Sequence, residues 1–192
     1  LGAQALARKG IPTIGIPGTI DNDLGYTELS LGFDTAVNVC VEAVRAIRAT
    51  SRSHDRASVV EVMGRNCGDI ALNTALSTGS EIVIVPEMTN WSVDEIAHRL
   101  NALVDRGNQR ASIIVAEGAY KTMAPFDVYE FMKDYPSGSR PVFPGSPMDA
   151  YFLSRVVEHK VKKTEVRSTV IGYTQRGSQP TARDAAFAFE AG

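Results

Sequence analysis

Several features that define whole classes of protein are missing from this chain. It has two cysteines, Cys40 and Cys67, which are too few for a disulfide scaffold and lack metal-ligand spacing, so free thiols in a reducing compartment are expected. No apolar run approaches the ~20 residues that cross a bilayer, and no secretory signal opens the sequence. The net charge of −2 excludes a broad attraction to nucleic acid or anionic membranes. We therefore expect a cytoplasmic protein whose partners are neither nucleic acid nor membrane.

An initiating methionine is also missing, and the sequence starts at Leu1 inside a helical pattern. This start indicates a fragment, so the absence of a motif carries little weight. The chain has 192 residues, of which 44% are hydrophobic and 22% charged. That length can bury a sizeable core in one large domain or in parts of two.

Helical and strand-like patterns alternate along the chain. Helices are expected at 2–10, 30–53, 68–79, 93–107, 146 onward and 181–192. Strands rich in Val and Ile are expected at 11–16, 57–63, 81–87, 111–117 and 165–172. Ser92 with Glu95 predicts a capping box, and Asp149 predicts a second helix start. The alternation predicts an α/β fold, a parallel sheet in a three-layer α/β/α arrangement.

One segment interrupts this alternation. Between Glu117 and Ser146 the chain carries four prolines and several aromatic residues, and the segment is too long for an ordinary loop between a strand and a helix. We expect residues 121–145 to be an inserted surface segment.

Polar residues follow four of the predicted strands. Because ligands bind at the carboxyl ends of parallel strands, these residues are expected on one rim of the sheet. They are Thr19, Asp21, Asp23, Arg65, Glu117, Tyr173 and Arg176. Carboxylates and arginines together describe a site that deprotonates a hydroxyl and holds a phosphate.

Each residue also has a simpler interpretation. Asp21 and Asp23 are common turn-forming residues that accept hydrogen bonds from nearby backbone. They do not fit a calcium loop, because Gly25 comes one place too early and no glutamate closes the loop. Arg65 could be a surface ion-pair partner and Tyr173 a solvated rim residue. Their occurrence at successive strand ends favours the functional interpretation.

Three motifs point to a family. "PGTIDND", "ASVVEVMGRNCGD" and "GYTQRG" together resemble the 6-phosphofructokinases, which phosphorylate fructose 6-phosphate on its 1-hydroxyl in glycolysis, and the resemblance extends from Leu1 to about Asp184. It implies a two-lobed, phosphofructokinase-like protein. Residues 1–32 would end the nucleotide-binding lobe, 33–175 would form the sugar-phosphate lobe, and 176–192 would be a helix returning to the first lobe. The fragment alone is expected to be inactive.

The resemblance also implies residue roles. Asp21 would be the general base, Thr19 would contact the same end of the sugar or the phosphoryl group in transfer, and Arg65 would stabilise the migrating charge. Arg56 and Arg167 would reach into a neighbouring subunit's site, so a homo-oligomer, a tetramer, is expected. The implied substrate-binding residues are Thr19, Ile20, Asp21, Arg56, Met63, Gly64, Arg65, Glu117, Arg167, Tyr173, Thr174, Gln175 and Arg176.

ATP and Mg²⁺ are the implied donor and cofactor. Pyrophosphate-dependent relatives typically have lysine where this chain has Gly18, which favours ATP. Gly2 would remain from the nucleotide-binding helix, and Asp23 would support the magnesium shell, whose main ligand is expected upstream of Leu1. A pyrophosphate-dependent enzyme and a non-catalytic phosphosugar-binding relative are the alternatives.

Further positions match the ADP effector site of the bacterial-type enzymes. They are Arg48, Gly79, Ser80, Glu81 and Arg106. Asn108 and Arg110 lie where a basic run is usual, so part of that charge is lost or moved. Tyr173 replaces a common histidine, and Ser178 replaces the usual second glycine after "RG".

Overall fold

A parallel sheet lies at the centre of the computed structural model, which describes residues 2–126 and 148–192. The strand order is β2-β3-β1-β4, with every neighbouring pair parallel. In register, Val60 of β1 lies opposite Ile114 of β3 and Thr169 of β4. The strands are β1 (Ala57–Val62), β2 (Ile82–Ile84), β3 (Ser112–Ala116) and β4 (Val166–Val170).

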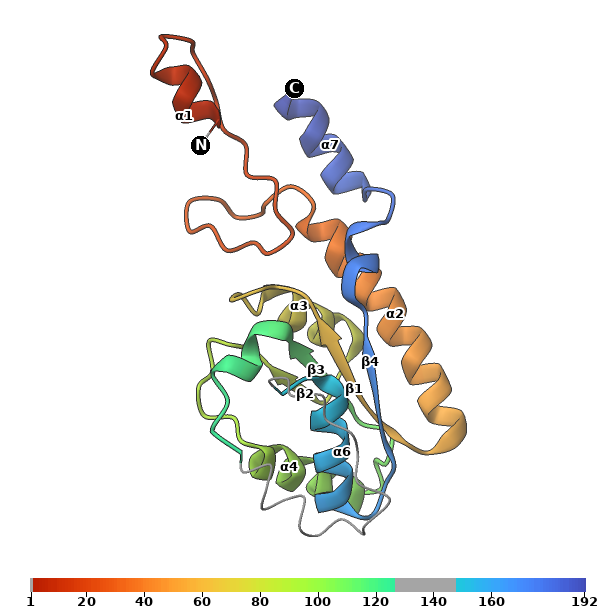
Figure 1. Cartoon of the computed structure of the whole chain (residues 1–192). Coiled ribbons are helices and arrows are strands. Elements are labelled where there is room, and N and C mark those ends of the chain that lie inside the picture. The colour runs from red at the N-terminus through yellow and green to blue at the C-terminus, as the bar shows by residue number, and fades with distance from the viewer. Residues whose placement is uncertain (1, 127–147) are drawn as a thin grey trace.

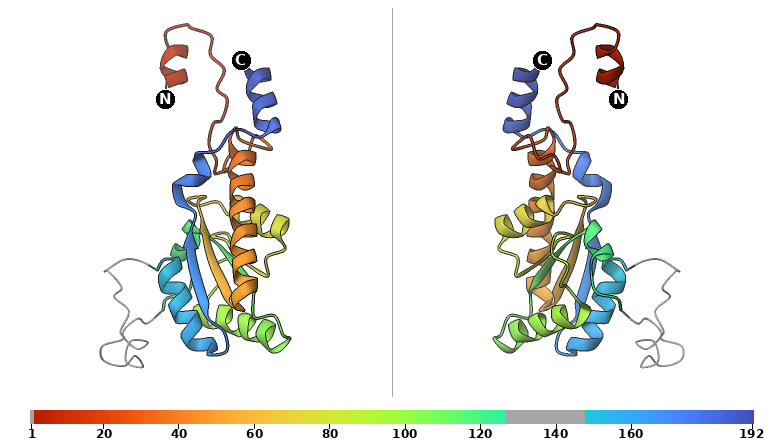
Figure 2. Two further views of the ribbon diagram at one scale, coloured as in Figure 1. Left: turned by 90° about the vertical axis from the view of Figure 1, so that its right-hand side faces the viewer. Right: turned by 90° about the vertical axis from the view of Figure 1, so that its left-hand side faces the viewer.

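Helices cover both faces of the sheet, as Figures 1 and 2 show. Alternate strand residues supply the two cores: Val59 and Ile113 pack with one pair of helices, and Val60 and Ile114 with the other. The predicted three-layer α/β/α architecture is confirmed. The first pair is α4 (Val93–Asp105) and α6 (Ala150–Val161), and the second is α2 (Phe33–His54) and α3 (Asp69–Thr78).

The predicted helix starts are confirmed by their caps. The Ser92 hydroxyl accepts a hydrogen bond from the Glu95 N–H at 3.1 Å, and the Asp149 carboxylate accepts one from the Phe152 N–H at 2.8 Å. The reciprocal bond of a capping box is not formed, because the Glu95 carboxylate pairs with Arg99 at 2.6 Å. These caps fix where α4 and α6 begin.

The strand predicted at 11–16 is wrong. These residues are irregular, and within the described residues they pair with no strand. A strand needs a hydrogen-bonded neighbour, and this segment extends beyond the sheet, where Ile14 is 92% exposed. The preceding helix α1 (Gly2–Ala7) is shorter than expected and buries no residue.

The last helix, α7 (Ala182–Ala191), joins the body of the molecule through its first turn. Its buried residue, Asp184, accepts hydrogen bonds from the backbone of Gly32 at 3.1 Å and of Thr35 at 2.9 Å, and from the Thr35 hydroxyl. The Thr181 hydroxyl donates to Asp34 at 2.6 Å. Asp184 therefore caps the amino end of α2, and Thr181 joins the start of α7 to it, which fixes where the 18–31 loop enters α2 (Figure 1).

Most of the segment predicted as a surface insertion, residues 121–145, lies outside the described residues. Within the described ranges, no helix is both long enough and apolar enough to span a membrane. Both cysteines are free, as predicted, and burial raises the pKa of the Cys40 thiol to about 12.

Candidate active site

A cavity of about 330 Å³ lies beyond the carboxyl ends of the strands. Its walls come from the 18–31 loop, the turn after β1, the start of the 3-10 helix η1 (Glu117–Lys121) and the end of the 3-10 helix η2 (Gly172–Arg176). Most of the residues predicted at the strand ends therefore meet in one place, although the first of the four segments is a loop rather than a strand. The lining residues are Gly18, Thr19, Ile20, Asp21, Leu31, Met63, Arg65, Glu117 and Arg176.

Two predicted rim residues, Asp23 and Tyr173, do not line this cavity. Leu31 does line the cavity. Its position in the sequence gave no signal, because it lies eight residues beyond the acidic pair, at the far end of the same loop. The backbone N–H of Leu31 donates to the Pro17 carbonyl at 2.9 Å, which closes the loop and brings its two ends together.

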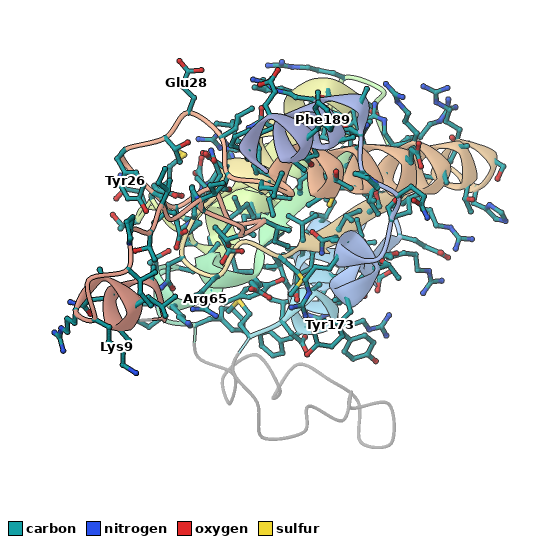
Figure 3. All side chains as sticks on the ribbon, turned by 90° about the horizontal axis from the view of Figure 1, so that it is seen from above. Lys9, Tyr26, Glu28, Arg65, Tyr173 and Phe189 are labelled. Atoms are coloured by element: carbon teal, nitrogen blue, oxygen red, sulfur yellow. The ribbon has the colours of Figure 1, made fainter. Side chains whose placement is uncertain are left out.

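Arg65 and Glu117 are positioned by a close backbone contact. The turn after β1 places Gly64 at φ 137° and Arg65 at φ 49°, and the Arg65 N–H donates to Glu117 Oε1 at 3.0 Å. A Cβ on Gly118 would lie 1.8 Å from the Arg65 carbonyl oxygen, so only glycine fits there. The Arg65 side chain is exposed at this end of the molecule (Figure 3).

Asp21 is a partly buried carboxylate with a raised pKa. Burial is the largest cause, and the negative charges of Asp23 and Glu117 act in the same direction, while Arg65 and Arg176 oppose them. The Asp21 backbone N–H donates to the Thr19 hydroxyl at 3.2 Å. A carboxylate with increased proton affinity beside two guanidinium groups is suited to accept a proton near a phosphate.

The turn-forming role considered for the two acids belongs to the residue between them. Asn22 has φ 56°, its Oδ1 accepts from the Ser30 N–H at 2.9 Å, and its Nδ2 donates to Asp69 Oδ2 at 2.8 Å. Within residues 2–126 and 148–192, the carboxylates of Asp21 and Asp23 accept no hydrogen bond. Both are therefore free to contact a ligand.

The "GYTQRG" motif forms η2, and its residues divide into two roles. The Arg176 guanidinium lines the cavity and stacks on the Tyr173 ring at 4.6 Å, while Tyr173 is 78% exposed. The Thr174 hydroxyl donates to the Ile171 carbonyl at 2.6 Å. Gln175 is buried, and its Oε1 accepts from the Met63 N–H at 3.1 Å. Thr174 and Gln175 thus hold the turn that carries Arg176, and their predicted contact with the substrate stays a prediction.

Arg56 and Arg167 lie at the opposite end of the sheet. Arg56 precedes β1 and Arg167 is the second residue of β4. Most of the length of a strand, at roughly 3.3 Å per residue, therefore lies between each arginine and the cavity. Both approach Glu165, at 3.8 Å for Arg56 and 2.9 Å for Arg167. Their predicted action in a neighbouring subunit's site stays a prediction.

Three of the predicted effector-site residues meet at the same end of the sheet as Arg56 and Arg167, where the strands begin. Arg48 pairs with Glu81 at 3.1 Å and also donates to the Ser112 hydroxyl, which donates to the Ser80 hydroxyl at 3.2 Å. Burial would raise the pKa of Glu81, but hydrogen bonds from Ser112 and Asn108, together with Arg48, lower it. Gly79 ends α3 at φ 63°, and Arg106 ends α4 and is exposed.

The described residues contain no cluster of three or more His, Cys, Asp or Glu side chains arranged to hold a metal. Magnesium, however, is commonly held by one or two carboxylates together with substrate phosphates. Asp23 fits that mode of binding, because its carboxylate oxygens accept no hydrogen bond from the described residues. Gly18 lines the cavity, whereas Gly2 lies in α1, beyond the sheet (Figure 1).

Comparisons of the sequence and of the structure with known proteins lead to the same family. The family model described as Phosphofructokinase matches residues 1–192. The chain is 42% identical over 191 residues to a protein of Alkaliphilus metalliredigens named ATP-dependent 6-phosphofructokinase, covering 100% of the chain and 50% of that relative. A protein of the same name from Clostridium tetani is 44% identical over 183 residues, covering 95% of the chain and 48% of the relative.

A solved structure gives the same result. The phosphofructokinase from Saccharomyces cerevisiae superimposes with a TM-score of 0.74 at 26% identity, covering 96% of this chain and 23% of that one. The chain thus spans about half the length of the curated relatives it matches.

Proposed function

Because the chain belongs to the phosphofructokinase family, we propose that the protein containing it transfers a phosphoryl group from ATP to the 1-hydroxyl of fructose 6-phosphate, a step of glycolysis in the cytoplasm. The observation that carries the proposal is the cavity in which Asp21, Arg65, Glu117 and Arg176 meet. Relatives about 40% identical along the whole chain are named ATP-dependent 6-phosphofructokinase, which favours ATP over pyrophosphate. The chain by itself is expected to be inactive.

Asp21 acts as the general base in this proposal. It accepts the proton of the 1-hydroxyl as the oxygen attacks the terminal phosphoryl group of the donor. Its raised pKa makes the ionised carboxylate a stronger base than an exposed aspartate. A well-placed base contributes a factor of roughly 10²–10⁴ to such a transfer.

The arginines and Glu117 orient the substrate and balance its charge. Arg65 lines the cavity beside Asp21 and stabilises the negative charge of the transferring group. Arg176 binds the 6-phosphate, since a planar guanidinium fork matches phosphate oxygens. The Glu117 oxygens accept hydrogen bonds from sugar hydroxyls, and Thr19 contacts the end of the sugar that reacts.

Magnesium would neutralise charge on the donor phosphates, and Asp23 would support its shell from this side. Gly18 leaves room for a nucleotide, because a Cβ at that position meets no atom within 4 Å. Gly18→Lys therefore tests the donor. It should lower kcat/KM for ATP at least about tenfold without lowering that for pyrophosphate.

The proposal extends to the lobes and to the assembly. We assign residues 1–32 to the end of the nucleotide-binding lobe, 33–175 to the sugar-phosphate lobe and 176–192 to the returning helix. Arg56 and Arg167, remote from the cavity of their own chain, would bind the 6-phosphate in a neighbouring subunit of a tetramer. Mixing inactive Asp21→Asn with inactive Arg167→Ala protein should restore activity in hybrid oligomers.

An effector site for ADP would use Arg48, Ser80 and Glu81, with Gly79 and Arg106 beside them. Arg48 already pairs with Glu81, and Asn108 supplies no positive charge. Weak activation by ADP is therefore expected.

The full-length protein tests the central proposal directly. A coupled assay offers fructose 6-phosphate with ATP or with pyrophosphate, for the parent and for Asp21→Ser. We expect turnover with ATP and a fall of at least about 10²-fold in kcat for the variant. Turnover with neither donor would instead support a phosphosugar-binding relative without catalysis. Undiminished turnover by Asp21→Ser would refute Asp21 as the general base.

A further inference from the structure

We propose that Asn22 and Asp69 are positioning residues for the reaction, because the hydrogen bond between them fixes the base-bearing loop against the turn that carries Arg65. This inference rests on the proposed function and deepens it. Neither residue lines the cavity, so neither is expected to touch the substrate.

Both polar atoms of the Asn22 side chain form hydrogen bonds, and neither partner can exchange its role as donor or acceptor. Its Oδ1 accepts from the Ser30 N–H at 2.9 Å, and its Nδ2 donates to Asp69 Oδ2 at 2.8 Å. A backbone N–H can only donate and a carboxylate can only accept, so the amide has one orientation that satisfies both partners. An aspartate at position 22 would place two carboxylates against each other.

The backbone of the loop also depends on Asn22. Its φ of 56° lies in the left-handed region, which asparagine tolerates better than most residues. The Ser30 hydroxyl donates to the Thr19 carbonyl at 2.6 Å, so the loop is closed on both sides of Asp21. The proposed base therefore lies between two anchored points.

Asp69 belongs to the segment that carries Arg65. It lies in the first turn of α3, four residues beyond Arg65. The intervening turn is itself fixed, because the Cys67 N–H donates to the Gly64 carbonyl at 2.7 Å and the Gly68 N–H donates to Glu87 at 2.8 Å. A displacement of Asp69 would therefore displace the turn.

The bond between Asn22 and Asp69 is the sole hydrogen bond between residues 17–31 and 63–69 in the described part of the chain. It joins positions 47 apart in the sequence. The geometry between Asp21 and Arg65 depends on this contact, and a misplacement of about 1 Å can cost about 10²-fold in rate. Substrate affinity depends more on Arg176, whose guanidinium is held by the Tyr173 ring at 4.6 Å and not by this bond.

A side-chain swap in the full-length protein tests the bond. Asn22→Asp sets two carboxylates against each other, and adding Asp69→Asn restores a donor and an acceptor in reversed order. The single variant Asp69→Asn keeps an acceptor oxygen for Asn22. Asp94→Asn is the matched control, because Asp94 is also an acid in the first turn of a helix, α4, but neither lines the cavity nor bonds to the 18–31 loop.

We expect Asn22→Asp to lower kcat about 10- to 100-fold with KM for fructose 6-phosphate changed less than about threefold. The swapped pair should recover at least about tenfold of that loss, and Asp94→Asn should stay within about threefold of the parent. Rates are compared on the pH plateau, where Asp21 is ionised in every variant. The thermal unfolding temperature shows whether each variant is folded.

Parental kcat in Asn22→Asp, or no recovery in the swapped pair, overturns the inference. If Asn22→Asp does not fold, Asn22→Gly replaces it, since glycine keeps the left-handed backbone and removes the bond. It should show the same fall in kcat, and a parental rate overturns the inference. An active parent with unaffected variants removes the positioning role alone, whereas a parent without turnover removes the proposed function and the positioning role together.

Discussion

The carboxylate of Glu117 accepts a hydrogen bond from the backbone N–H of Arg65 at 3.0 Å. The two residues are 52 positions apart in sequence, yet this bond joins the ends of neighbouring strands β1 and β3. One side chain thus supports the left-handed turn of the other while its remaining oxygen stays available to a ligand. The contact depends on the residue that follows Glu117.

Gly118→Ala should disrupt that contact. The new methyl group would lie 1.8 Å from the Arg65 carbonyl oxygen, so the two turns must separate. We expect a loss of about 2–4 kcal/mol in the free energy of unfolding and a fall in kcat of at least about 10²-fold. Denaturant unfolding and the coupled assay measure these effects. Gly25→Ala is the control, because its methyl group would meet no atom within 4 Å; an equal loss there would contradict the explanation.

The pH dependence of activity should follow the charges around Asp21. Burial and Asp23 raise its pKa, whereas Arg176 lowers it. Removing a negative neighbour favours the ionised form, so Asp23→Asn should move the acid limb of kcat/KM to lower pH. Arg176→Gln should move the same limb to higher pH. Titration of the substrate phosphate is common to all variants and cancels in the comparison; shifts in one common direction would refute the assignment of Asp21 as the base.

The same raised pKa predicts an exchange of stability for activity at Asp21. Since the folded state binds the proton more tightly than the unfolded chain does, ionised Asp21 destabilises the fold at pH values above its folded pKa. Asp21→Asn removes that charge, so its Tm at neutral pH should exceed the parent's while kcat falls at least about 10²-fold. Differential scanning calorimetry checks the first result. A lower Tm would mean that the carboxylate has a stabilising partner.

Asp184→Ala should destabilise the junction between α7 and α2. It leaves the backbone N–H groups of Gly32 and Thr35 without their acceptor, which costs about 2–3 kcal/mol. Burial alone would raise the pKa of Asp184, but hydrogen bonds from Thr35 and Gly32 lower it overall. Its contribution is therefore present above the ordinary pKa of 3.8 and is lost as the pH falls through the lower, folded value.

Denaturant unfolding at neutral and acidic pH measures this contribution. The difference in unfolding free energy between the parent and Asp184→Asn should shrink as the pH falls. Glu190→Ala, an exposed acid on the same helix, is the control and should change stability by less than about 0.5 kcal/mol. A difference that is independent of pH would rule out the charge of Asp184 as the cause.

Tyr173 should act through its ring rather than its hydroxyl. The ring lies 4.6 Å from the Arg176 guanidinium, and an exposed contact of this kind contributes about 0.5–1 kcal/mol. Tyr173→Phe should therefore leave KM for fructose 6-phosphate within about twofold, whereas Tyr173→Ala should raise it about two- to fivefold. Equal effects of the two variants would indicate that the hydroxyl binds the phosphate directly.

Sequence patterns predicted the sheet and its two helical layers because buried strands and amphipathic helices carry periodic signals of their own. They predicted a strand at 11–16 from an apolar run, but apolar residues form a strand only beside a partner, and Ile14 has none in the described structure. The position of α7 likewise depends on Asp184, whose contacts are 149 and 152 residues away in the chain.

The candidate site was likewise predictable only in part from the sequence. Asp21, Arg65, Glu117 and Arg176 are recognisable because their residue types and their places at strand ends suggest chemistry. Asn22 and Gly118 were missed, since one acts through a bond to Asp69 and the other through the absence of a side chain. The signal was present in each case, an asparagine between two acids and a glycine after the strand-end glutamate, but only coordinates show what each contacts.

The attachment of α7 determines how that helix can move. Its first turn is held by short polar contacts, while beyond Asp184 the helix places Phe189 in solvent, 88% exposed (Figure 3). A helix held at one end behaves as a lever on a pivot: small rotations at Thr181–Asp184 become large displacements at its far end. Amide hydrogen exchange should therefore be slow at the pivot and faster toward Ala191. Because Asp184 accepts hydrogen bonds from Gly32 and Thr35, a rotation at this pivot would also shift the end of the loop that carries Asp21.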